Sequence, residues 1–455
     1  MSPVVHEEAK SLSWSDRPGR ELVRLSWPIA VSMLSYSLMS LVDTMFVGHM
    51  GSAALAGVGL GAVLSLSTLV FGIGLVRGAK TLISQAVGAG RAEEYGPYLG
   101  ASMLLGLLYS VLALLAAQGI AWWLGAGNAD PAHHQASIYM HVRSCGAPFV
   151  LLYMAIREAR YGKGDARSPM VATLIANLAN IALNVLFVIV LRMGVFGSAL
   201  ATALAHAIEA LALVAVQWRE GFGVRGMTRA HVRALRDVGV PSGLQFALEV
   251  GAFALLASIV SMTGAVNMAA HQIALNLIHV SFLPAFALGE AAAVLTGNAV
   301  GARRSDLIHV VAKSAVLLAG AYTGACTILF VVFSRVIGRV FTDEVPVQHL
   351  VATLMIIAAC FQVADAANMV ARGVLRGAGD VRVPALIGVV TAWVMSPPLA
   401  WLLGVTWHMG AVGAWIGLTG EIFLGAGVLW WRLLRSKFRA QLVLAASDPE
   451  PIAAE

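Results

Sequence analysis

The chain is divided into twelve apolar segments, each about as long as the roughly 20 residues that a helix needs to cross the hydrocarbon core of a bilayer. A helix satisfies its backbone hydrogen bonds internally, so such a segment can lie in lipid as a helix. Only 12% of the residues are charged, about half the share in soluble proteins, which excludes a cytosolic enzyme, a secreted disulfide-framed module and a disordered scaffold. The predicted spans are 25–48, 54–76, 98–120, 136–158, 170–191, 197–217, 238–262, 270–294, 310–332, 348–371, 384–404 and 411–431.

The positions of the basic residues test this count. With twelve spans, all but four of the 30 Lys and Arg residues fall on the side of the two termini, and a wrong count would destroy this asymmetry. Basic residues gather on the cytoplasmic side, so we expect a multi-pass plasma-membrane protein, in the inner membrane of a bacterium, with both termini cytoplasmic. The first 24 residues lack the uninterrupted apolar core of a cleavable signal peptide. The four exceptions are Arg143, Arg192, Arg335 and Arg339.

The second half of the chain repeats the first. The matching segments are AVGA at 86–89 and 299–302, displaced by 213 residues, GKGDARSP at 162–169 and GAGDVRVP at 377–384, displaced by 215, and Gly194 with Gly410, displaced by 216. An even number of crossings gives both copies the same orientation, and ligands are expected at their interface. The sequence thus predicts an all-α integral membrane protein with two pseudo-symmetric six-helix lobes. The predicted parts are a cytoplasmic tail (1–20), an N-lobe (21–217), a cytoplasmic linker (218–236), a C-lobe (237–434) and a cytoplasmic tail (435–455).

Acidic residues inside the spans are the informative charges, because an ionised group in lipid needs a partner or a function. For Glu209, Glu290 and Glu421 the favoured interpretation is structural, through pairing or proximity to an interface. Asp43, Glu249 and Asp365 have no Lys or Arg within one helical turn. All charges near the middle of the spans are predicted to be acidic.

Two helix faces in the second half combine an acid with aromatic or soft side chains. Such a face suits an amphipathic organic cation, because the carboxylate supplies charge and the ring or thioether supplies apolar contact. The residues that share a face are Gln245, Glu249 and Phe253 in one span, and Phe361, Asp365, Asn368 and Met369 in another.

The fifth span carries an amide stripe formed by Asn177, Asn180 and Asn184. Amides in lipid must face protein or water. With Asp43 and Thr202 they offer oxygen ligands for a monovalent cation, or a hydrogen-bonded cage for a protonatable carboxyl. The alternative is that these amides only hold helices together.

Enzyme and cofactor motifs are absent from the sequence. It contains no HExxH, no GxSxG and no GxxxxGK[ST], so we expect no enzyme activity, no cofactor and no nucleic-acid partner. The three cysteines, Cys145, Cys326 and Cys360, lie apart in or beside apolar runs and are interpreted as small hydrophobic residues, not metal ligands or disulfide partners.

The chain resembles the multidrug and toxic compound extrusion (MATE) transporters, specifically their NorM-like bacterial branch. The similarity runs from about Leu22 to Leu434. It is carried by the segments LVDTMFVG at 41–48, LEV at 248–250, AAHQIALN at 269–276, FQVADA at 361–366 and LRG at 375–377.

The resemblance implies two six-helix lobes in a V around a central cavity, and export of drugs, mostly organic cations, in exchange for H+ or Na+ by alternating access. The cation-coupling site of the N-lobe is implied at Asp43, Asn180, Asn184 and Thr202. The resemblance implies further cation or substrate ligands in the C-lobe at Glu249 and Asp365, and Gln245 and Phe361 lie beside them. No metal beyond Na+ is expected, and we expect a monomer in the bilayer with no obligatory protein partner.

One departure concerns the coupling ion. Related chains often carry a tyrosine four residues before the aspartate of the tenth span, where this sequence has Phe361. The ring for cation–π contact is kept and the hydroxyl is lost. This weakens the prediction of a sodium site in the C-lobe and favours proton coupling or cation binding in the N-lobe.

Three other functions compete with drug export. A flippase for lipid-linked precursors from the same superfamily should line its cavity with arginines, unlike the acidic spans predicted here. A major-facilitator porter should have a Gly-Asp-Arg type loop where this chain has QAVGAGR at 85–91. A membrane enzyme or structural protein would need a catalytic constellation or a soluble partner-binding segment, and neither is visible.

Overall fold

The computed structural model describes residues 12–126 and 130–435, and every regular element among them is helical. The first half holds α1 (Pro18–Gly48), α2 (Ser52–Val76), α3 (Gly78–Gly88), η1 (Ala92–Glu94), α4 (Tyr95–Gly125), α5 (Pro131–Ser144), α6 (Ala147–Gly162), α7 (Arg167–Asn184), the π-helix η2 (Val185–Val190) and α8 (Gly194–Trp218). After η3 (Val224–Gly226), the second half holds α9 (Arg229–Ser261), α10 (Ala265–Gly301), α11 (Asp306–Phe341), α12 (Val345–Gly377), α13 (Arg382–Val394), α14 (Ser396–Leu399), the π-helix η4 (Ala400–Thr406) and α15 (Gly410–Leu434).

All twelve predicted spans fall on helical segments. In the described ranges, eleven helical stretches are long and apolar enough to cross a membrane by themselves. The remaining span, 136–158, is divided between α5 and α6 by a break at Cys145 and Gly146. The break has local causes, because Pro148 lies in the first turn of α6 and Gly146 packs against the backbone of Ala203.

The predicted N-terminal tail and the predicted linker both end inside helices. Helix α9 begins at Arg229, so residues 229–236 of the predicted linker are helical. A capping box explains the early start, because the side chains of Thr228 and His231 each accept a hydrogen bond from the backbone N–H of the other residue. Helix α1 begins at Pro18, within the predicted tail. Residues 1–11 and 436–455 of the two tails lie outside the described residues.

The backbone carries the repeat that the sequence predicts. Positive φ angles occur at matching positions, with values of 109° and 112° at Gly51 and Gly264, and 61° and 60° at Gly194 and Gly410. Matching π-helices, η2 and η4, precede the second pair. The two halves therefore share turns as well as helices.

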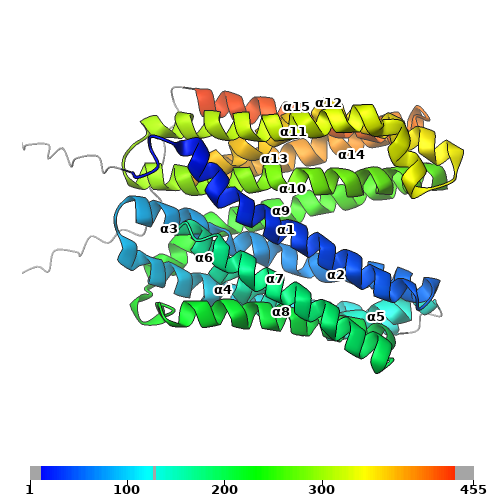
Figure 1. Ribbon diagram of the computed structural model, residues 1–455, viewed down its shortest axis with the longest axis horizontal. Helices are drawn as coiled ribbons and strands as arrows, with labels where there is room; N and C mark the ends of the chain where they lie inside the picture. The colour runs from blue at the N-terminus through cyan, green and yellow to red at the C-terminus, as the bar shows by residue number, and fades with distance from the viewer. Residues whose placement is uncertain (1–11, 127–129, 436–455) are drawn as a thin grey trace, which may run out of the picture.

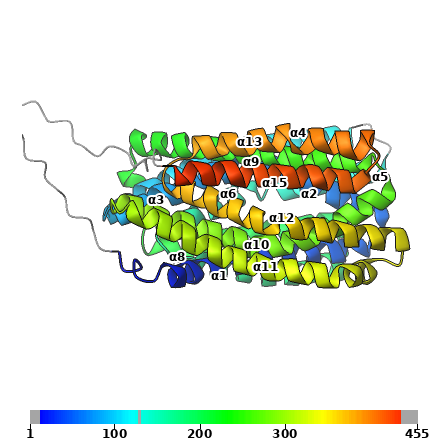
Figure 2. The same cartoon turned by 90° about the horizontal axis from the view of Figure 1, so that it is seen from above.

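The helices form two bundles that run along the long axis of the molecule (Figure 1). Helix α1 crosses between them. Its first turns pack against α10 and α11, where Leu22 and Leu25 belong to a cluster built mainly from the second half, and its later part packs against α7. Helix α1 begins and α15 ends at the same end of the molecule (Figure 2), which we call the terminal end.

The bundles touch closely near the terminal end, where α3 packs against α10. A Cβ atom on Gly88 would lie 2.1 Å from the carbonyl oxygen of Asn298, and one on Gly301 would lie 2.0 Å from that of Gln85. Only glycine leaves room for backbones at this separation.

Candidate functional site

A cavity of about 560 Å³ lies between α9, α10, α12 and α15, with Arg77 from the end of α2 at its wall. This volume is typical of a site for a drug-sized molecule. All seven residues of the two predicted helix faces line it: Gln245, Glu249, Phe253, Phe361, Asp365, Asn368 and Met369. The periodicity of α9 and α12 thus predicted which residues share each face, and the structure shows that the two faces line one cavity.

Glu249 is paired inside the cavity. Its Oε1 accepts hydrogen bonds from Arg372 at 2.6 Å and from the side-chain amide of Gln245 at 3.0 Å. Arg372 is 8% exposed and its Nε also donates to Asn368. Arg372 lies near the end of α12 and beyond the predicted span 348–371, so the cavity holds a basic residue that the sequence analysis assigned to a loop. This pairing could not be read from helical spacing, because the arginine comes from a different helix, 123 residues away.

Asp365 and Phe361 lie one helical turn apart on α12. The Phe361 ring is 2% exposed and packs against Trp415, with 6.2 Å between ring centroids. Among the described residues, no hydrogen bond or ion pair reaches the carboxylate of Asp365, although Arg372 and Glu249 are near enough to act on its charge. Glu421 of α15 also lines the cavity.

The predicted residues of the N-lobe meet in a second polar site. The carboxylate of Asp43 accepts hydrogen bonds from Asn184 at 2.7 Å and from Thr202 at 2.9 Å. The amide of Asn180 lies 3.5 Å from the Thr202 hydroxyl. These four side chains come from α1, α7 and α8, and all are less than 9% exposed. The third amide, Asn177, lies apart from them and donates to Ser35.

Oxygen atoms dominate this N-lobe site. The Oδ1 atom of Asn184 is buried without a hydrogen-bond partner in the described chain. A hard monovalent cation takes carboxylate, amide and hydroxyl oxygens as ligands, and a proton would be held equally well by a carboxylate with such neighbours. The arrangement fits either coupling ion.

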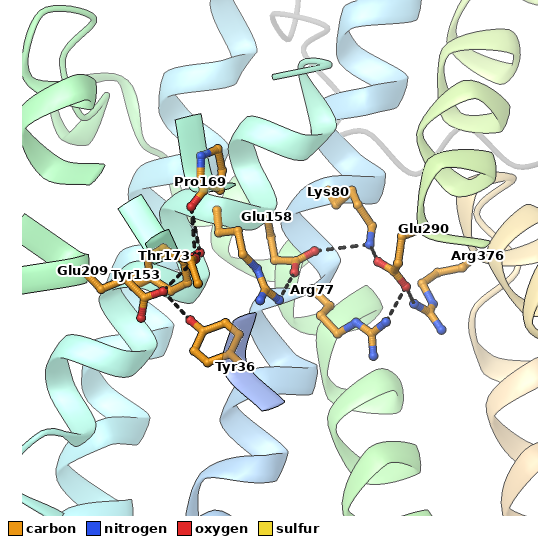
Figure 3. A network of polar contacts seen from close by, with 11 residues as sticks. Tyr36, Arg77, Lys80, Tyr153, Glu158, Pro169, Thr173, Glu209, Glu290 and Arg376 are labelled. Carbon is orange, nitrogen blue, oxygen red and sulfur yellow. Dashed lines mark hydrogen bonds and ion pairs between the residues drawn. The ribbon is translucent and has the colours of Figure 1, made fainter. Parts of the chain in front are cut away.

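A buried ion network joins the two bundles between the cavity and the terminal end (Figure 3). Its central carboxylate, Glu290 of α10, pairs with Arg77 and Lys80 from the first half and with Arg376 of α12 at 3.3 Å. Lys80 is fully buried and also lies 3.2 Å from Glu158 of α6. The network therefore ties α10 to α3 and α6.

Glu209 forms a separate buried cluster within the first half. Its carboxylate accepts hydrogen bonds from Tyr36 at 2.6 Å and Thr173 at 2.8 Å (Figure 3). It also lies 3.2 Å from the His206 ring. Both Glu209 and Glu290 thus have the partners that a structural interpretation requires.

Sequence reasoning missed Lys80, Arg372 and Arg376 as interior residues and assigned them to loops. A signal was present for the two arginines, because the helical pattern of α12 continues to Gly377. This helix has 33 residues, well beyond the minimum of about 20.

Comparison with known proteins agrees with this architecture. The sequence profile of the family described as MatE matches residues 28–186 and 241–402. The multidrug resistance protein MdtK of Edwardsiella ictaluri is 30% identical over 421 residues, covering 88% of this chain and 92% of that protein. A probable multidrug resistance protein NorM of Pseudomonas syringae pv. tomato is 30% identical over 449 residues, covering 91% and 96%.

A solved structure shares the fold. It is described as the outward-facing conformation of a multidrug resistance MATE family transporter of the MOP superfamily, and it superposes with a TM-score of 0.84 at 23% identity, covering 93% of this chain and 98% of that one. The predicted fold class is confirmed. Since the family profile and the relatives both span most of the sequence, this multi-pass membrane protein belongs to the MatE family.

Proposed function

We propose that the protein is a secondary active multidrug efflux antiporter. It exports organic compounds, mostly amphipathic cations, in exchange for H+ or Na+ by alternating access. The main support for this proposal is the cavity, whose wall combines carboxylates with the aromatic rings of Phe253, Phe282 and Phe361. Such a surface binds a flat apolar cation by charge and by ring contact. The multidrug resistance names of the relatives support the same substrate class.

The coupling ion binds at the Asp43 site in this proposal. That site and the cavity share none of their residues, and the site is built from α1, α7 and α8. Ion binding there and drug binding in the cavity can therefore act on the same equilibrium between outward-open and inward-open states without direct contact. Helix α1 packs on both bundles and connects them.

The proposal also covers the lobes, the orientation in the membrane and the oligomeric state of the protein. The lobes are residues 21–217 and 237–434, the terminal end faces the cytoplasm of a bacterium, and the protein acts as a monomer in the inner membrane. The asymmetry of basic residues supports this orientation. The binding of H+ or Na+ requires no organic cofactor.

Asp43→Asn should abolish ion-driven export. Purified protein in sealed liposomes should move a fluorescent cationic dye when either a pH gradient or a sodium gradient is applied, and the active gradient names the ion. The variant should reduce the rate of dye export to that of protein-free liposomes. The asparagine amide neither takes up a proton as a carboxylate does nor supplies a formal charge to Na+. Dye movement is followed by fluorescence.

Asp130→Asn is the matched control, because this aspartate is 53% exposed and caps α5. Its dye export should equal that of wild type. If neither gradient moves any of a panel of organic cations, the drug-export proposal is wrong. If Asp43→Asn exports as fast as wild type, coupling does not occur at Asp43.

One observation favours a second function, the transport of a lipid-linked or metabolite substrate that carries phosphate. Arg77, Arg372 and Arg376 line the cavity, against the expectation of acids alone. Arginine suits phosphate, but all three guanidinium groups already contact Glu249 or Glu290. If a fluorescent isoprenyl pyrophosphate, rather than cationic dyes, bound the purified protein and crossed the liposome membrane, this second function would replace the first.

A further inference from the structure

The two cavity acids predicted to bind cations differ in their partners. Glu249 already has a cation, since Arg372 donates to its Oε1 at 2.6 Å. Asp365 has no hydrogen bond or ion pair within the described part of the chain. One acid is therefore neutralised by the protein itself, and the other is free to meet a ligand.

The pair between Arg372 and Glu249 is held in place by its surroundings. Arg372 donates through Nε to Asn368 at 3.0 Å, and Gln245 donates to the carboxylate of Glu249. Gly388 of α13 lies against the pair. A Cβ atom on Gly388 would lie 2.5 Å from Oε1 of Glu249 and 3.3 Å from a terminal nitrogen of Arg372. The glycine thus allows α13 to cover the ion pair closely.

An organic cation gains little at Glu249. It would have to displace a guanidinium group that is 8% exposed and hydrogen-bonded at two places. Breaking a buried pair leaves a displaced charge without a partner, which is strongly unfavourable. Asp365 presents no such obstacle, and it lies one turn from the ring of Phe361 on the same helix.

We propose that Arg372 is the resident counter-ion of Glu249 and leaves Asp365 as the acid that binds the cationic group of the substrate. Arg372 is then a specificity-determining residue, because it sets how much negative charge the cavity offers. The substrate class rests on the function proposed above. The pairing itself is a property of this chain.

The test is a rescue experiment on purified protein, read by binding of the cationic dye rhodamine 6G. Glu249→Gln frees the positive charge of Arg372 beside the cavity and should weaken binding about tenfold, because like charges are brought together. Adding Arg372→Gln removes that charge and should return the affinity to near the wild-type value. Asp365→Asn should weaken binding by a similar factor.

Arg376→Gln is the matched control for rescue. Arg376 lies one turn along α12 and lines the same cavity, but it pairs with Glu290. Adding it to Glu249→Gln changes the formal charge by the same amount and should not restore affinity. Rescue by both arginine changes would show that only total charge matters and would overturn the proposal.

The affinity for an anionic dye should change in the opposite direction, which distinguishes the charge effect of the substitution from a damaged fold. Fluorescein shares the ring system of rhodamine, and it should bind Glu249→Gln more tightly than wild type. A misfolded variant would lose both dyes. If Glu249→Gln does not fold, the double variant with Glu249→Gln and Arg372→Gln still tests the proposal. If the dye bound Glu249 directly, the affinity of this double variant for the dye would fall well below that of wild type.

Failure of the proposed function and failure of the inference about Arg372 and Asp365 give different results. Rhodamine binding to wild type without export under any gradient would refute the proposed function and leave the roles of Arg372 and Asp365 standing. Binding and export by wild type, with no rescue of Glu249→Gln by Arg372→Gln, would overturn this inference alone. Absence of binding to wild type by rhodamine 6G and by every other cation of the panel would overturn both.

Discussion

Glu290→Gln should lower the free energy of unfolding by about 3–5 kcal/mol, the usual cost of removing one partner from a buried ion pair. Glu290 is the carboxylate that joins Arg77, Lys80 and Arg376, and it is 6% exposed. Without its charge, buried cations from both bundles face one another, and Glu158 is left as the acid that pairs with Lys80. The loss should appear as a fall in the unfolding temperature of the detergent-solubilised protein.

Glu220→Gln provides the comparison. Glu220 also contacts two basic residues, Arg160 and Lys163, but its side chain is 40% exposed. Water screens such contacts, so the change should cost less than about 1 kcal/mol. Equal unfolding temperatures for the two variants would show that the buried network contributes no more than a surface pair.

Gly301→Val should force the bundles apart at the terminal end and stop transport. Its Cβ atom would lie 2.0 Å from the carbonyl oxygen of Gln85, and this oxygen belongs to the backbone of α3 and cannot rotate away. The helices must therefore separate. Spin labels at the exposed positions Glu93 and Ser305, in a variant without the native cysteines, should report an increase of several ångströms.

Gly119→Val is the control for this prediction. Gly119 lies in α4, and a Cβ atom there would meet no atom within 4 Å. The distance between the labels and the rate of dye export should be unchanged. If Gly301→Val exports dye at the wild-type rate, close packing of α3 on α10 is not needed in the transport cycle.

The apolar segments and the repeat could be predicted because they depend on local and periodic properties. Hydropathy over about 20 residues identified the spans, and helical spacing placed Glu249 and Phe253, or Phe361 and Asp365, on common faces. The interruption at Cys145 had a readable cause in Pro148. The grouping of Asp43, Asn184 and Thr202 followed from the family resemblance.

The ion pairs could not be predicted, because they join helices that are distant in sequence. Arg77 and Glu290 are separated by 213 residues. The average hydropathy of a segment also assigns every Lys or Arg near its end to a loop. Lys80 is fully buried because α3 continues α2 without leaving the protein interior, and Glu158 and Glu290 neutralise it there.

The π-helices bear on how the two halves diverged. The displacement between matching residues grows from 215 at Pro169 and Pro384 to 216 at Gly194 and Gly410, so this stretch is one residue longer in the second half. An extra residue in a regular α-helix would rotate all that follows by about 100°. Here η4 has seven residues where η2 has six, and the glycines beyond keep nearly equal φ angles. The wider turns absorb the difference of one residue, so the glycines at the start of α8 and α15 keep matching backbone conformations.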